Sequence, residues 1–325
     1  MPAQRLDYID AAKGIGILFV ICSHSRSSDL MWFAWEFCIP VFFVLSGYTY
    51  RYKDMPFPTF IAKKADRLLI PYVFKNILML AILAVIGKAT LDNVWGALYS
   101  RFSIYPFGDP LYHQIFHRWC APTWFLSALF TASIWVYFTR GDRRRELWAI
   151  PLFLLITYGF LQLPILLPWS LDTSFYFAAF ILAGKYVREY DIDSKPWWLM
   201  LIITALYFII IEFDGDINHS VRILSDYPAL AFIASVFGSV VIIWLSKRLP
   251  SFLMKPLTAL GRNSLWVFCI HYPIISTFNI ITLRTLAWGN WPLFYAIGVC
   301  FILLTAVICY YIALLLPRIF PFLKS

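Results

Sequence analysis

Three ionisable side chains lie in the first apolar segment of the chain, residues 9–25: Asp10, Lys13 and His24. Lys13 and His24 are separated by almost three turns of an α-helix, or about 16 Å along its axis. Asp10 lies one turn before Lys13, so all three side chains share one helix face. Ionisable groups are costly inside a membrane and therefore mark functional candidates. The stripe predicts a charged pair near one end of the helix and, near the other, an imidazole suited to proton transfer.

The second apolar segment, residues 30–50, should run back in the opposite direction. We expect Glu36 in its outer portion, near the depth of His24, and Ser46 in its inner portion, near the depth of Lys13. At that depth, the Glu36 carboxylate is predicted to orient the His24 imidazole or to favour its charged form, as in many acid–base pairs. The alternative is that Glu36 lies in the outer headgroup zone, because helix ends are placed only to within one or two residues.

A basic cluster follows in what we expect to be a loop: Lys63, Lys64 and Arg67. Such a loop is typical of the cytoplasmic side of a membrane protein. It equally suits a phosphate-binding patch at the cytoplasmic mouth of a site, because Lys and Arg are the usual phosphate ligands.

The ninth apolar segment, residues 264–283, is preceded by Arg262 and Asn263 and begins at Ser264. Asn263 or Ser264 can cap the start of this helix. His271 lies about two turns in, either as a packed, hydrogen-bonded core histidine or as a site residue. Trp124 opens the fourth segment and by itself predicts an interfacial aromatic anchor.

We predict no metal site. His113 and His117 have the i, i+4 spacing of a helical zinc site. However, Gln114 stands where a metalloprotease motif has glutamate.

The composition places these residues in a membrane protein. Hydrophobic residues make up 61% of the 325 residues and charged residues 14%, well below the charged share of soluble domains. The net charge of +9 fits cytoplasmic loops rather than a nucleic-acid surface, because no basic stretch with interleaved aromatic residues lies outside the apolar segments. The six cysteines show no spacing that predicts a disulfide framework, and no cleavable signal peptide is evident.

Ten apolar segments approach the ~20 residues that span a bilayer. Lys and Arg concentrate in alternate connecting segments, as expected for cytoplasmic loops. We therefore predict an all-α, polytopic membrane protein with about ten transmembrane helices, cytoplasmic N- and C-termini, and a single domain over residues 1–325 without a fused soluble domain. The segments are residues 9–25, 30–50, 68–87, 122–139, 148–167, 173–188, 197–213, 228–246, 264–283 and 292–316.

Several of these residues stand in motifs that resemble the acyltransferase-3 family of integral-membrane O-acyltransferases, in particular its fucose 4-O-acetylase-like branch. The matching motifs run in order from the first segment to the ninth: RLDYIDAAKGIGI at 5–17 with His24, PVFFVLSGY at 40–48, RLLIPY at 67–72, WFL at 124–126, and LGRNSL at 260–265 with His271. Two positions depart from the pattern. Lys13 stands where much of the family has Arg, and Cys38 stands where the branch often has His, so no second imidazole is expected there.

The resemblance implies acetyl-CoA, or a related acyl-CoA, as donor and a hydroxyl of an envelope glycan or glycolipid as acceptor, in the bacterial inner membrane. In this interpretation the nucleotide of CoA lies near Lys63, Lys64 and Arg67, and the pantetheine arm passes Lys13 and Ser46. His24 is then the general base. Asp10, Trp124, Arg262, Asn263, Ser264 and His271 support the site.

The alternative is a transporter or flippase of an envelope precursor, because buried ionisable residues also line transport pathways. We find no inverted repeat of the kind that many transporters show. Release of thiol from acetyl-CoA distinguishes the two, since a pure transporter yields none. The sequence leaves open the acceptor sugar, the acyl group, the membrane side of transfer, a covalent intermediate and the oligomeric state.

Overall fold

A computed structural model of the chain describes residues 6–51, 53–101, 103–105, 122–285 and 291–323. Over these described residues the fold is helical apart from one two-stranded antiparallel sheet, β1 (Ile217–Asn218) with β2 (Ile223–Leu224), in which Ile217 pairs with Leu224. The α-helices are α1 (Asp7–Ser23), α2 (Pro40–Tyr48), α3 (Phe57–Val85), α4 (Leu91–Tyr99), α5 (Trp124–Thr139), α6 (Arg143–Leu161), α7 (Leu171–Glu189), α8 (Trp197–Phe213), α9 (Pro228–Ser246), α10 (Ser251–Arg262), α11 (Ser264–Thr285) and α12 (Trp291–Ile319). Short 3₁₀ helices are η1 (Ser28–Ala34), η3 (Pro168–Ser170), η4 (Ile192–Ser194), η5 (His219–Val221) and η6 (Pro321–Leu323).

The length and composition of several helices support the prediction of a membrane protein. Within the described residues, three helices are long and apolar enough to cross a bilayer, over Phe57–Val85, Pro228–Ser246 and Pro292–Ile319, and three shorter apolar helices cover Trp124–Thr139, Trp197–Phe213 and Ser264–Ile280. These helices expose large apolar side chains on the surface of the protein; Ile77 on α3, for example, is 61% exposed. A soluble protein rarely exposes such extended apolar surface.

Each predicted apolar segment overlaps a helix, but two expectations change. The single helix expected over residues 30–50 is wrong: η1, with Met31 in a non-helical conformation, and a series of turns precede the short helix α2. Pro40 is the first residue of α2 and has no N–H to donate to the carbonyl oxygen of Glu36, which accepts from the Ser235 hydroxyl instead, so a continuous helix cannot run through this position. The basic cluster expected in a loop lies instead within α3, which begins at Phe57.

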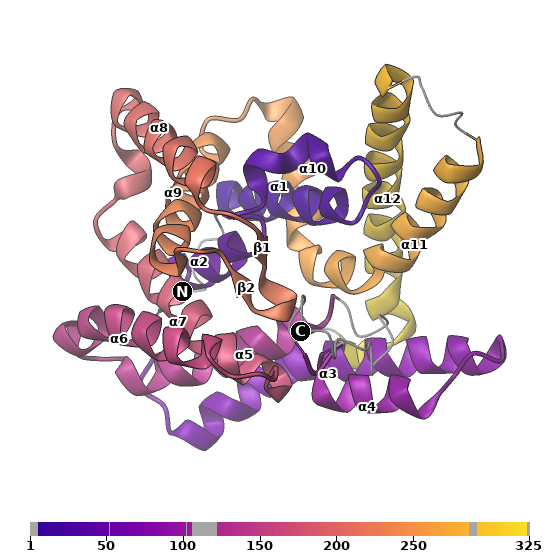
Figure 1. Ribbon diagram of the computed structural model, residues 1–325, viewed down its shortest axis with the longest axis horizontal. Coiled ribbons are helices and arrows are strands. Elements are labelled where there is room, and N and C mark those ends of the chain that lie inside the picture. The colour runs from indigo at the N-terminus through magenta and orange to yellow at the C-terminus, as the bar shows by residue number, and fades with distance from the viewer. Residues whose placement is uncertain (1–5, 52, 102, 106–121, 286–290, 324–325) are drawn as a thin grey trace.

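The helix α1 lies at the centre of the molecule, where it contacts α2, α9, α10, α11 and α12. Figure 1 shows α1 beside α10, with α8 and α9 on one side and α11 and α12 on the other. The helices α5, α6 and α7 form a second group, against which α2 packs through α7. The first apolar segment therefore has protein on every side, and its polar face meets other helices rather than lipid.

The crossing of α1 and α10 depends on glycine. A Cβ atom at Gly14 would overlap the carbonyl oxygen of Leu257, and one at Gly261 would overlap the carbonyl oxygen of Asp10. The absence of side chains lets the two backbones touch. This contact brings Arg262, the last residue of α10, beside the acidic residues at the start of α1.

Candidate active site

A cavity of about 300 Å³ lies at the His24 end of α1. We call it the His24 cavity. Its walls come from the end of α1, the turns before α2, the start of α5, the β1–η5 segment and α11. The lining residues are Val20, Ser23, His24, Trp35, Cys38, Ile39, Pro122, Trp124, Ile217, Asn218, His219, Ser220, Phe268 and Tyr272. Of the predicted site residues, His24 and Trp124 therefore share one cavity.

Helix α11 positions His24. The ring centroid of His24 lies 5.3 Å from that of His271 and 5.1 Å from that of Tyr272. The side-chain amide of Asn279 donates to the carbonyl oxygen of His24 over 2.8 Å, and its oxygen accepts from the backbone N–H of Arg26 over 3.0 Å. The C-terminal end of α1 is thus tied to α11, and the His24 ring is held between two α11 rings.

The tautomer of His271 follows from its partners. Its Nδ1 lies 2.9 Å from the carbonyl oxygen of Phe268 and 3.2 Å from that of Val267. Carbonyl oxygens only accept hydrogen bonds, so Nδ1 carries the hydrogen and Nε2 keeps its lone pair. Within the described residues, this buried Nε2 has no hydrogen-bond partner. His271 therefore presents an acceptor next to the His24 ring.

A larger cavity of about 840 Å³ lies at the Lys13 end of α1. We call it the Lys13 cavity. It brings together most of the residues predicted to hold the donor, namely Lys13, Ser46, Lys64 and Arg67, with the supporting residues Asp10, Arg262, Asn263 and Ser264. Arg51 and Arg188 complete its basic lining. Lys63 is exposed and does not line the cavity, so the structure separates the two neighbouring lysines.

Ion pairs compensate the acidic charge of this cavity. The Nζ of Lys13 lies 3.2 Å from a carboxylate oxygen of Asp10, and the Nε of Arg262 lies 3.5 Å from the other. Arg262 also pairs with Asp7 over 2.7 Å. Among the described lining residues, Asp10 is the sole acidic side chain. The cavity consequently keeps an excess of positive charge and suits an anionic ligand such as a phosphate.

Aromatic rings separate the two cavities. Phe268 lines both of them, and its ring centroid lies 4.8 Å from that of Phe125. Phe42, which packs against Phe125 with ring centroids 5.7 Å apart, lines the Lys13 cavity. An apolar barrier that includes Phe125 and Phe268 therefore lies where the basic cavity and the cavity with an imidazole meet.

The predicted partnership of Glu36 with His24 is not what these contacts show. The Glu36 side chain is buried, does not line the His24 cavity, and interacts with the carboxyl group of Asp214. The Ser225 hydroxyl donates to Asp214, and burial raises the pKa of Asp214 to about 6. Two adjacent buried carboxyl groups disfavour a double negative charge. The catalytic role of Glu36 stays a prediction, and His271 is the group observed beside His24.

Sequence reasoning missed His219, which lines the His24 cavity as a second imidazole. It stands on η5, in a segment with no helical periodicity, so no spacing related it to His24. Reasoning from sequence also missed the ion pairs of Asp172 with Arg101 and Arg222, which join the first turn of α7 to the segments after α4 and after η5. His113 and His117 lie outside the described residues.

Comparison with known proteins gives one match. The model of a protein family described as an acyltransferase domain, Acyl_transf_3, matches residues 6–311. No curated protein and no solved structure matches the chain. The matched range includes every residue named above in either cavity.

Proposed function

The chain belongs to the Acyl_transf_3 family of acyltransferases, and from this we propose that it moves an acetyl group from cytoplasmic acetyl-CoA to a hydroxyl of an envelope sugar. One observation supports the proposal above the others. A basic cavity and an imidazole cavity meet at Phe268, so a donor and an acceptor can approach one point from opposite ends of α1. We further propose that the protein resides in the bacterial inner membrane.

The Lys13 cavity is the proposed donor site. Acetyl-CoA carries its negative charge on phosphates at one end and its thioester at the end of a slender arm. Lys64 and Arg67 on α3 and Arg188 on α7 offer charge-assisted hydrogen bonds to phosphates. The arm then extends past Lys13 and Ser46 toward the Phe125–Phe268 barrier, which brings the thioester carbon to the edge of the His24 cavity.

His24 is the proposed general base. One ring nitrogen of His24 accepts the proton of the acceptor hydroxyl. The other carries the hydrogen and lies on a ring beside that of His271, whose Nε2 has no hydrogen-bond partner within the described residues. The hydroxyl oxygen attacks the thioester carbon, a C–O bond forms and the C–S bond breaks. The CoA thiolate takes the proton from His24 and leaves as CoA thiol. A base of this kind contributes about 10²–10⁴-fold to rate.

The experiment compares wild type, His24→Ala and Lys63→Ala in matched cells. Lys63 is exposed and outside both cavities, so its variant controls for expression and handling. Envelope glycans are profiled by mass spectrometry before and after mild base, which removes O-acetyl esters. We expect a base-labile acetyl group with wild type and Lys63→Ala and none with folded His24→Ala. An unchanged acetyl group in the His24 variant would refute the proposed base. Absence of CoA thiol release by purified wild type would instead favour a transporter.

A further inference from the structure

His219 is a buried imidazole with unused hydrogen-bonding capacity. Its side chain is 4% exposed, and its ring packs against Tyr176 and Phe177, with centroids 6.2 and 5.8 Å away. Within the described residues, its Nε2 has no hydrogen-bond partner. Burying a polar atom without a partner costs about 1–3 kcal/mol. Folding tolerates this cost most readily where a ligand supplies the missing partner, and His219 lines the His24 cavity.

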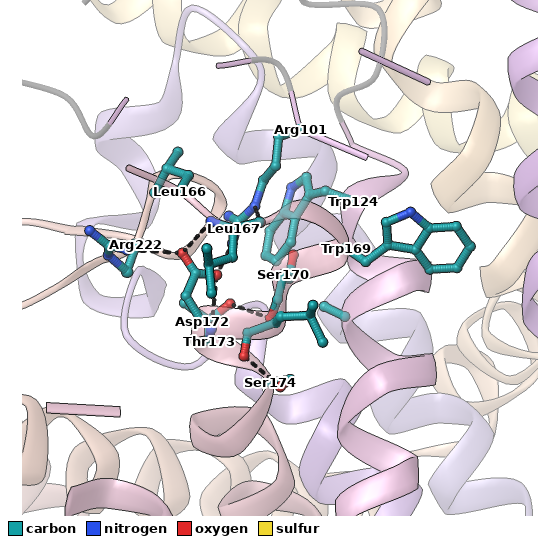
Figure 2. A network of polar contacts seen from close by, with 12 residues as sticks. Arg101, Trp124, Leu166, Leu167, Trp169, Ser170, Asp172, Thr173, Ser174 and Arg222 are labelled. Carbon is teal, nitrogen blue, oxygen red and sulfur yellow. Dashed lines mark hydrogen bonds and ion pairs between the residues drawn. The ribbon is translucent and has the colours of Figure 1, made fainter. Parts of the chain in front are cut away.

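The segment that carries His219 is held rigidly. Asp172 accepts from both Arg101 and Arg222, and Figure 2 shows the three side chains converging. Arg101 also donates over 2.7 Å to the carbonyl oxygen of Ser220, the residue after His219. The side chains of Arg101 and Asp172 are completely buried, and that of Arg222 nearly so.

Arg222 continues this anchoring on the other side of η5. It donates over 2.7 Å to the carbonyl oxygen of Ile165, although its own backbone is left-handed with a φ of 61°. The pairing of β1 with β2 closes the same segment at its base. The imidazole is therefore preorganised, and a ligand need not order the segment on binding.

The remaining walls of the His24 cavity indicate the kind of ligand. Trp35 and Trp124 offer flat apolar rings, while Asn218 and Ser220 flank His219 with polar groups. A cavity with aromatic surfaces and a few placed polar groups suits a compact ligand that has both an apolar face and several hydroxyls. A sugar ring has this character, whereas a simple alcohol lacks the additional hydroxyls.

We propose that His219 hydrogen-bonds a second hydroxyl of the carbohydrate acceptor while His24 acts on the hydroxyl that is acylated. The inference rests on the proposed function and deepens it, because it restricts the acceptor class to sugars with at least two free hydroxyls in reach. Burial lowers the pKa of His219 to about 4. At pH 7 the ring is neutral, so it presents one donor and one acceptor, which suits a hydroxyl. His219 is a positioning residue and takes no proton in the reaction.

The test uses the full chain purified in lipid nanodiscs. The acceptor probe is the glycan fraction extracted from cells that lack the protein, and the donor is radiolabelled acetyl-CoA. His219→Phe keeps a ring against Tyr176 and Phe177 but removes both nitrogens, and His219→Gln restores a hydrogen-bonding group near Nε2. Asp216→Asn is the matched control, because Asp216 is exposed in the same segment and does not line the cavity.

We expect His219→Phe to raise KM for the glycan about tenfold, since it removes one hydrogen bond in a buried site. Its kcat and its KM for acetyl-CoA should stay within about twofold of wild type, and His219→Gln should recover most of the affinity. An unchanged glycan KM in folded His219→Phe overturns the inference alone. A kcat loss equal to that of His24→Ala also overturns it, because His219 would then act in the chemistry. No transfer by wild type refutes the proposed function and this inference together.

Discussion

The two neighbouring lysines of α3 provide a matched test of the donor site. Lys64 lines the Lys13 cavity, with its Nζ 5.7 Å from the centroid of the Phe60 ring, whereas Lys63 is exposed and outside the cavity. Replacing either residue by alanine removes one positive charge at nearly the same place in the sequence. The long-range field of the protein therefore changes by a similar amount in both variants. A difference between them reports a local contact with the donor.

The magnitude follows from the environment of Lys64. Its side chain is partly buried, so a contact with a CoA phosphate is less screened than an exposed ion pair but more screened than a buried one. Such a contact contributes about 1 kcal/mol, which corresponds to about a fivefold rise in KM for acetyl-CoA. We expect Lys63→Ala to change this KM by less than about twofold, because exposed charges contribute little. The kcat at saturating donor should be unchanged in both, because neither side chain reaches the reacting atoms in the proposed arrangement.

The assay is the initial rate of CoA thiol release over a range of acetyl-CoA concentrations. Cys300 is an exposed free thiol, so the protein is blocked with a thiol reagent before the donor is added. Repeating the series at higher salt should shrink the Lys64 effect, since screening weakens charge contacts. Equal KM values for the two variants would refute the assignment of the Lys13 cavity to the donor phosphates. A larger effect at Lys63 would place the phosphates outside the cavity.

Three further predictions concern the scaffold and are measured by thermal unfolding in detergent. Gly261→Ala should destabilise the protein by about 1–3 kcal/mol, because its Cβ would overlap backbone atoms of α1; Gly159→Ala, where nothing lies within 4 Å, should be neutral or slightly stabilising. Asp172→Asn should destabilise by about 3–5 kcal/mol because it leaves two buried arginines without their carboxylate, whereas Glu189→Gln, in an exposed pair with an arginine, should cost less than about 1 kcal/mol. The pKa of Asp214 is raised to about 6 in the fold, so the folded state binds the proton more tightly than the unfolded state, and stability should fall as pH rises from about 4 to about 6. Asp214→Asn should flatten that slope, and an unchanged slope would contradict the assigned group.

Much of the fold could be predicted because lipid imposes a simple requirement. Every backbone polar group inside a bilayer must be satisfied within its own helix, so apolar length alone indicates helices. The segments at 197–213 and 228–246 coincide with α8 and α9 to the residue. The segment at 30–50 failed because apolar length does not register breaks within a segment. The helix η1 and several turns precede Pro40, which has no N–H to join them to α2, and α2 is too short to span a bilayer by itself.

The residues of the Lys13 cavity were more predictable from the sequence than those of the His24 cavity. Lys13 and Asp10 share a helix face because of their spacing, and the structure pairs them. Glu36 was related to His24 by depth alone, and depth does not determine the direction of a side chain in broken helical structure. The position of His219 depends on the ion pairs of Asp172 with Arg222 and Arg101. These partners are 50 and 71 residues away from Asp172 in the sequence. Such long-range contacts leave no periodic signal in one sequence.

The apolar barrier at Phe268 bears on how the proposed reaction avoids hydrolysis of the thioester. A thioester exposed to water beside a general base would be hydrolysed, because water competes with the acceptor hydroxyl for the same proton-transfer step. Phe125 and Phe268 are buried and pack against each other, and Phe268 lines both cavities. In the proposed reaction, these apolar rings lie beside the thioester carbon and disfavour bulk water there, while the His24 cavity holds the acceptor. Polar residues at these two positions would bring water to the reacting atoms of the proposed reaction, so that chemistry, as well as packing, favours aromatic rings there.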